Sequence, residues 1–258
     1  MSSLPLLNLS ALQHAIGCMD EEDGYDDAAY YNIWLKWMQA CGPRRPRFQA
    51  WGSVSARGKR MFYETVNRAE NDRFSAGQYD SPYTRMDIDE ILKQGIWSIE
   101  HVLPRSKVNG RSPGEAENDV FGWDVATRRA NSRRSNLPLV LWPTKNLDVG
   151  RVDIDGVEHF NPPEESKAAL ARKWVYIRAT YGFIDTLDPP STAQTKHRDS
   201  IVQLVRGERI GYAEERLVLL LSNYCKTMLG AGWTNPLYNS EAAARFLDDE
   251  DFLSLVFS

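Results

Sequence analysis

Glu100 and His101 stand side by side in the segment 99–104 and combine a carboxylate with an imidazole. Histidine has an unperturbed pKa of about 6.5, so it can accept a proton at neutral pH. Asn131 follows thirty residues after His101 and supplies an amide oxygen, and Arg133 and Arg134 lie beside it. Carboxylate and amide oxygens suit Mg²⁺, and guanidinium groups suit phosphate. These residue types fit phosphodiester hydrolysis, in which a base deprotonates water while a metal stabilises the developing charge.

The charge around these residues is locally basic. The whole chain has 31 Lys and Arg against 35 Asp and Glu, a net charge of −4, which argues against a protein that coats nucleic acid. Between His101 and Gly150, eight basic residues stand against five acidic ones. A nucleic-acid site is therefore expected in this segment alone. The basic residues are Arg105, Lys107, Arg111, Arg128, Arg129, Arg133, Arg134 and Lys145.

The composition indicates a globular protein with a sizeable core. The chain has 258 residues, 42% of them hydrophobic, and no apolar run of the roughly 18 residues that a membrane span requires. The first residues lack a basic signal-peptide start, so we expect a cytoplasmic or host-intracellular protein, or a secreted one if a signal was trimmed away. We do not expect it to act at a membrane. Cys18, Cys41 and Cys225 have no CxxC spacing, which predicts buried free thiols.

Several elements can be predicted from apolar spacing. A strand is expected at 96–99, ending before Pro104, and a second apolar run covers 137–142. Residues 252–257 form an apolar tail that must pack against another part of the chain. Helices are expected at 26–40, 59–68, 88–92, 162–181, 212–229 and 241–247.

The two blocks around His101 and Asn131 resemble the endonuclease I family of the His-Me finger (ββα-metal) nuclease superfamily. That family has a Glu-His-Val-x-Pro block, matched here at 100–104, and an Asn-x-x-Arg-x-Asn block followed by Leu-Pro, matched at 131–138. Weaker likeness continues through 160–181 and 232–238 in the same order. The resemblance implies an α+β, mostly helical protein. It divides the chain into an N-terminal helical region (1–95), a small ββα-metal finger (96–150) and a C-terminal helical region (151–258) that packs on the finger.

The resemblance also implies roles for individual residues. Glu100 and Asn131 would bind one divalent cation, Mg²⁺ or otherwise Mn²⁺ or Ca²⁺, and His101 would be the general base. Glu117 would be a third carboxylate near the metal. Arg134 would assist catalysis by contacting phosphate or by stabilising the finger. The nucleic-acid-binding residues would be Arg105, Arg111, Arg128, Arg129, Arg133 and Arg134.

The sequence departs from the family in the finger itself. Residues 121–123 stand where the family has His-Asn-Leu, so Asp124 or the packing of Trp123 would have to replace the structural asparagine. Neighbouring residues of a regular strand also point to opposite faces, so we expect Glu100 and His101 at a strand end. A rival register makes Asn136 the structural asparagine, Asn146 the metal ligand and 137–142 the second strand.

The expected function is a metal-dependent endonuclease that cuts DNA, or otherwise RNA, largely without sequence preference. One alternative is a non-catalytic nucleic-acid-binding or structural protein on a decayed finger, which would bind DNA without cutting it. Another is a restriction, homing or viral genome-processing endonuclease in which the first 90 residues select the target. Cleavage assays with and without EDTA would separate these alternatives.

Overall fold

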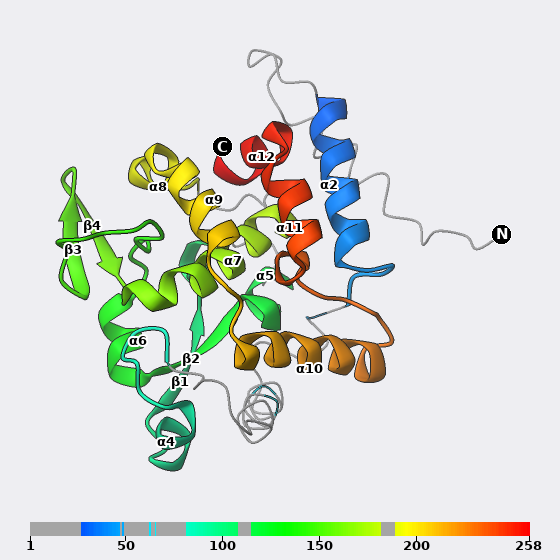
Figure 1. The fold of residues 1–258 in the computed structure, drawn as a ribbon. Coiled ribbons are helices and arrows are strands. Elements are labelled where there is room, and N and C mark those ends of the chain that lie inside the picture. Colours follow the sequence, from blue (N-terminus) through cyan, green and yellow to red (C-terminus); the bar gives the residue numbers. More distant parts are fainter. Residues whose placement is uncertain are drawn as a thin grey trace.

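The computed structural model describes residues 27–46, 48, 62, 65, 81–107, 115–181 and 189–258. The described chain is mostly helical and holds two small antiparallel sheets, each of two strands (Figure 1). This confirms the α+β, mostly helical class. Within the described residues, no helix is both long enough and apolar enough to cross a membrane.

The first sheet and the helix that follows it form a compact unit. Strand β1 (Trp97–His101) pairs with β2 (Trp123–Thr127) so that Glu100 lies opposite Asp124 and His101 opposite Trp123. Helix α6 (Arg128–Arg134) starts directly after β2, where the Thr127 side chain accepts a hydrogen bond from the Ala130 amide at 3.2 Å. The order of elements is strand, strand, helix. Between the strands lie η2 (Arg105–Lys107), α5 (Glu115–Asn118) and η3 (Val120–Gly122).

The rival register is wrong about the second strand. Residues 137–142 form no strand and make only an isolated bridge between Leu139 and Phe160. The run is apolar because Leu139, Val140, Leu141 and Trp142 are buried. The strand that pairs with β1 is instead β2, in which all five residues are buried.

A second hairpin was not predicted. Strands β3 (Gly150–Ile154) and β4 (Val157–Asn161) pair antiparallel, and the hairpin projects from one side of the molecule (Figure 1). Its turn uses Asp155 and Gly156, with φ of 54° and 82°. An Asp-Gly pair between apolar residues is a strong signal for such a turn. The hairpin was therefore visible in the sequence, within a region expected to be helical.

The predicted helices form close to their expected bounds wherever the structure describes them. The predicted helix at 59–68 lies outside the described residues except for Phe62 and Thr65, which are helical. Helices α8 and α9 were not predicted, and the apolar tail forms α12. The helices are α2 (Asp27–Cys41), α4 (Ile88–Lys93), α7 (Glu164–Tyr181), α8 (Thr192–Lys196), α9 (Arg198–Gly207), α10 (Tyr212–Met228), α11 (Ser240–Leu247) and α12 (Glu250–Phe257), with the short η4 (Pro236–Tyr238) before α11.

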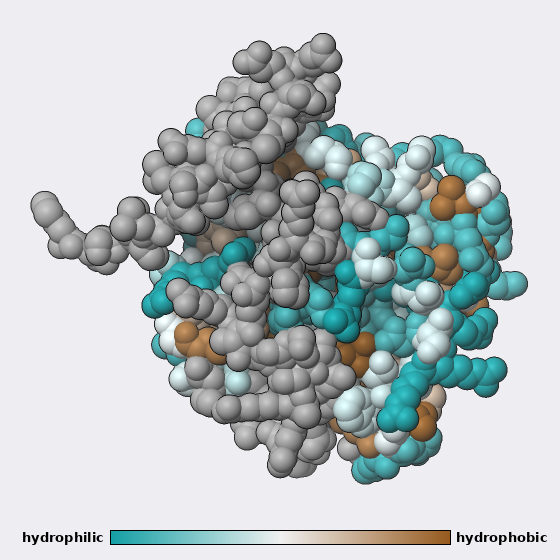
Figure 2. All heavy atoms as spheres, turned by 180° about the vertical axis from the view of Figure 1, so that it is seen from behind, coloured by the Kyte–Doolittle hydropathy of each residue, from teal (hydrophilic) through white to brown (hydrophobic). Residues whose placement is uncertain are grey.

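Helix α7 lies at the centre and contacts α2, α9, α12 and η3 (Figure 1). The tail packs where Phe252 approaches Trp37 of α2, with ring centroids 5.0 Å apart. This confirms that the apolar tail packs against another part of the chain. Cys41 and Cys225 are buried free thiols, as expected, and Cys18 lies outside the described residues. On the face seen in Figure 2, the hydrophobic residues that are coloured lie scattered among hydrophilic ones.

Candidate functional site

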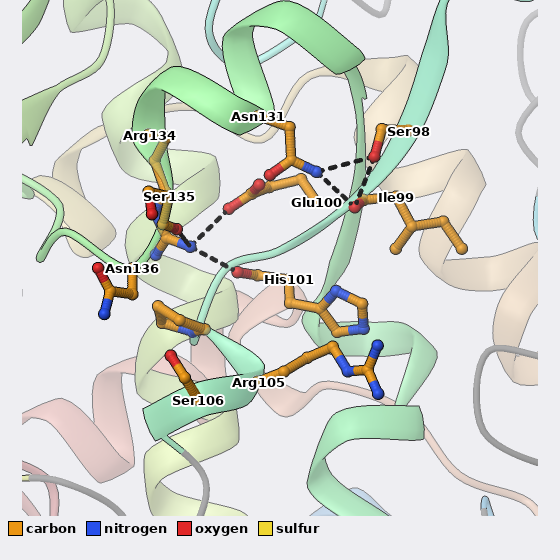
Figure 3. A pocket seen from close by; sticks show the side chains of 11 residues that line it. Ser98, Ile99, Glu100, His101, Arg105, Ser106, Asn131, Arg134, Ser135 and Asn136 are labelled. Carbon is orange, nitrogen blue, oxygen red and sulfur yellow. Dashed lines mark hydrogen bonds and ion pairs between the residues drawn. The ribbon is translucent and has the colours of Figure 1, made fainter.

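A polar cavity of ≈ 490 Å³ opens beside the end of β1 (Figure 3). Strand β1, helix α6 and the start of η2 all contribute to its walls. Glu100 and His101 of β1 therefore share one cavity with Asn131 of α6. The lining residues are Ser98, Ile99, Glu100, His101, Pro104, Arg105, Ser106, Asn131, Arg134, Ser135 and Asn136.

Asn131 is fixed on α6 by two hydrogen bonds to β1. Its amide nitrogen donates to the Ser98 hydroxyl at 2.9 Å and to the Ile99 carbonyl at 2.8 Å. A backbone carbonyl can only accept, so the amide cannot be turned over without losing that bond. The Asn131 oxygen consequently points toward the Glu100 carboxylate (Figure 3).

Glu100 is a buried carboxylate whose two oxygens differ in their contacts with the described part of the chain. Its Oε1 accepts from the Tyr83 hydroxyl at 2.6 Å and lies 3.0 Å from Arg134 Nη1. Its Oε2 is buried and has no hydrogen-bond partner among the described residues. Burial raises the pKa of Glu100 from 4.5 to about 7, against the lowering effects of the Arg134 charge and the Tyr83 hydrogen bond. An unpaired buried carboxylate oxygen is costly, which makes it a suitable cation ligand.

Arg134 holds the end of β1 in place. Its guanidinium donates to the His101 carbonyl at 3.0 Å and to the Val102 carbonyl at 2.7 Å, in addition to its ion pair with Glu100. The side chain is only 3% exposed. Of the two roles that the resemblance implies for Arg134, this geometry favours stabilisation of the finger over contact with phosphate.

His101 is the last residue of β1, and the chain turns immediately after it. Its ring packs edge-on against Trp123, with centroids 5.6 Å apart. Figure 3 shows the imidazole leaving the strand on the side opposite to the Glu100 carboxylate. The alternation of strand residues is thus kept, and the two side chains reach one cavity from different sides.

The other expected site residues are distributed around the cavity. Glu117 does not line it and forms an ion pair with Arg105, which does. Asn146 is exposed and also lies outside the lining. Arg128, Arg129 and Arg133 are exposed on α6, and Arg111 lies outside the described residues.

Asp124 and Trp123 attach β2 to its surroundings. Asp124 Oδ2 forms a buried ion pair with Lys173 of α7, and its Oδ1 accepts from the Val125 amide at 2.8 Å. The Trp123 indole donates to the Glu117 carbonyl at 2.8 Å. Asp124 and Trp123, which the sequence analysis named as replacements for a structural asparagine, therefore both make contacts that hold β2 in place.

Tyr83 and Ser98 were missed by the sequence analysis. Ser98 lies two residues before Glu100 on β1, so strand periodicity could have placed it on the same face. Tyr83 lies before the finger, and no local pattern relates it to Glu100.

Comparisons with known protein families, curated proteins and solved structures found no match for this chain. Among the described residues, no group of three or more His, Cys, Asp and Glu side chains could hold a metal ion. Glu100 and Asn131 would offer a donor set of another kind, one carboxylate and one amide.

Proposed function

We propose that the chain is a divalent-metal-dependent nuclease that hydrolyses phosphodiester bonds of DNA, with RNA as the second candidate substrate. One observation carries this proposal: an antiparallel pair of strands followed directly by a helix brings Glu100, His101 and Asn131 to one cavity. The order of elements and the residue types are similar to those of the His-Me finger nucleases that the sequence resembles.

The donor atoms suit Mg²⁺. Glu100 Oε2 has no hydrogen-bond partner in the part of the chain that the structure describes, and the Asn131 oxygen points toward the same carboxylate (Figure 3). Mg²⁺ binds through few protein oxygens and keeps several waters, so one carboxylate and one amide suffice. When bound, the cation stabilises the charge that develops on the phosphate and the leaving oxygen.

His101 is the general base that takes the proton from the attacking water. In an in-line displacement, the attacking and leaving oxygens lie on opposite sides of the phosphorus. His101 and Glu100 leave β1 on opposite sides. The imidazole can therefore deprotonate the attacking water while the carboxylate of Glu100 lies toward the leaving oxygen. Arg134 and Trp123 hold the strand end and the imidazole in this arrangement.

Exposed arginines beside the cavity bind the nucleic-acid backbone. Arg128, Arg129 and Arg133 lie on the exposed part of α6, and Arg105 lies at the wall of the cavity. Contacts with phosphates position the substrate but do not read its bases. Cleavage is therefore largely independent of sequence and weakens as salt concentration rises.

A cleavage assay tests the proposal. Purified protein is incubated with supercoiled plasmid, single-stranded DNA and RNA in Mg²⁺, in EDTA, and in EDTA followed by excess Mg²⁺. We expect cutting that EDTA stops and added metal restores, and loss of cutting in Glu100→Gln with unchanged circular dichroism. Binding without cutting on every substrate, or cutting that EDTA leaves intact, would contradict the proposal.

A further inference from the structure

The Glu100 carboxylate is held by a residue from outside the finger. The Tyr83 hydroxyl donates to Glu100 Oε1 at 2.6 Å, and both residues are buried. Tyr83 comes from a turn that precedes α4, whereas the other Oε1 partner, Arg134, comes from α6. Two donors from separate segments thus converge on one carboxylate oxygen.

The turn around Tyr83 is fixed independently of Glu100. The Ser81 amide donates to the Met86 carbonyl at 2.9 Å, and the Arg85 amide donates to the Ser81 carbonyl at 3.0 Å. The Tyr83 ring packs against Phe160 of β4, with centroids 4.9 Å apart. The hydroxyl therefore approaches Glu100 from a position that the surrounding structure determines.

We propose that Tyr83 is a positioning residue for the metal-binding carboxylate. Tyr83 and Arg134 together occupy Oε1, which fixes the rotation of the carboxylate and leaves Oε2 for the cation. This inference rests on the proposed function. It also makes the segment before residue 96 part of the active site, so that the finger is incomplete without it.

The chain offers a matched pair of variants. Tyr83→Phe removes the hydroxyl and keeps the ring that packs on Phe160. Tyr238→Phe removes the hydroxyl of a half-buried tyrosine, which donates to Glu214 Oε1 at 2.7 Å. Neither Tyr238 nor Glu214 lines the cavity. Partners of metal ligands typically change metal affinity by about 10- to 100-fold when mutated. We expect Tyr83→Phe to weaken Mn²⁺ binding about tenfold and Tyr238→Phe to leave it unchanged.

Electron paramagnetic resonance monitors Mn²⁺ titrations and gives the Mn²⁺ affinity of each variant. Cleavage assays give kcat and KM for plasmid at low and at saturating Mn²⁺. Saturating Mn²⁺ should restore kcat of Tyr83→Phe to within about threefold of the wild type, at unchanged KM, because the hydroxyl acts only on the ligand. Equal Mn²⁺ affinities in the two variants, or a kcat that saturating metal does not restore, would overturn the positioning role alone. A wild-type protein that binds no Mn²⁺ would overturn the proposed function together with this inference.

Discussion

At the scale of single residues, the site keeps a polar atom that folding alone would not favour. Glu100 Oε2 is buried without a hydrogen bond to any described residue, whereas Oε1 of the same carboxylate has two donors. Leaving a buried acceptor unpaired costs about 1–3 kcal/mol. Buried polar atoms without a hydrogen bond occur at functional sites, where a ligand is expected to bind them. Glu100 is therefore the residue at which stability and the proposed activity oppose each other most directly.

His101 gives the first prediction. If its imidazole is the general base, His101→Ala should lower kcat by about 10²- to 10⁴-fold, the usual contribution of a positioned proton acceptor. Mn²⁺ affinity should stay unchanged, because the imidazole lies on the opposite side of β1 from Glu100. Single-turnover cleavage of plasmid and Mn²⁺ titration measure the two quantities. A variant that cuts as fast as the wild type would exclude His101 as the base.

At the scale of elements, Arg134 gives the second prediction. Arg134→Ala leaves the Glu100 carboxylate buried beside an empty guanidinium site and frees two carbonyls at the end of β1. Removing one partner of a buried ion pair costs about 3–5 kcal/mol. The neighbouring Arg133 is exposed, so Arg133→Ala should change the free energy of unfolding by no more than about 0.5 kcal/mol. Urea unfolding compares the two, and similar losses would show that Arg134 does not stabilise the finger.

The exposed arginines of α6 give the third prediction. Each arginine that contacts a phosphate adds about 1 to the slope of log binding constant against log salt. The double variant Arg129→Ala/Arg133→Ala should therefore bind duplex DNA more weakly and reduce that slope by about 2. Arg209→Ala, an exposed arginine before α10, is the control. An unchanged slope in the double variant would place the substrate elsewhere on the molecule.

Helices with a clear apolar period could be predicted, and a strand buried on both faces could not. Helices α2, α7 and α10 follow their predicted bounds because one face of each repeats apolar residues. Strand β2 shows no alternation, since all five of its residues are buried, and it was missed. Glu100, His101 and Asn131 could be named as candidates because they lie in two short blocks of sequence that resemble a family pattern. Tyr83 was missed because only the folded chain brings it to Glu100.

At the scale of the whole molecule, Asp119 joins the segment before β2 to the central helix. Its Oδ2 accepts from the hydroxyls of Tyr176 at 2.7 Å and Tyr181 at 2.9 Å, both on α7. The Trp233 indole donates in turn to the Tyr176 hydroxyl at 2.7 Å. Burial raises the pKa of Asp119 from 3.8 to about 7, although these hydrogen bonds lower it. The network therefore connects the segment before β2 to the helical core through a carboxyl whose pKa is raised to about 7.

The pKa of Asp119 gives the fourth prediction. Between pH 3.8 and about 7 the folded protein holds a proton that the unfolded chain has lost. The folded state therefore binds more protons, and the free energy of unfolding falls as pH rises through this range, by at most about 1.4 kcal/mol per pH unit for one group. The stabilisation is complete below about pH 4 and is lost as pH passes 7. Urea unfolding at pH 5, 6, 7 and 8 measures it.

Asp119→Asn separates this contribution from that of Glu100, whose pKa is raised in the same direction. Asparagine is neutral at every pH and keeps an acceptor for the Tyr176 and Tyr181 hydroxyls, so the variant should lose only the part of the pH dependence that belongs to Asp119. The slope between pH 5 and 7 should become shallower without vanishing, because the buried Glu100 still titrates. A variant whose slope equals that of the wild type would mean that Asp119 is ionised in the folded protein throughout this range.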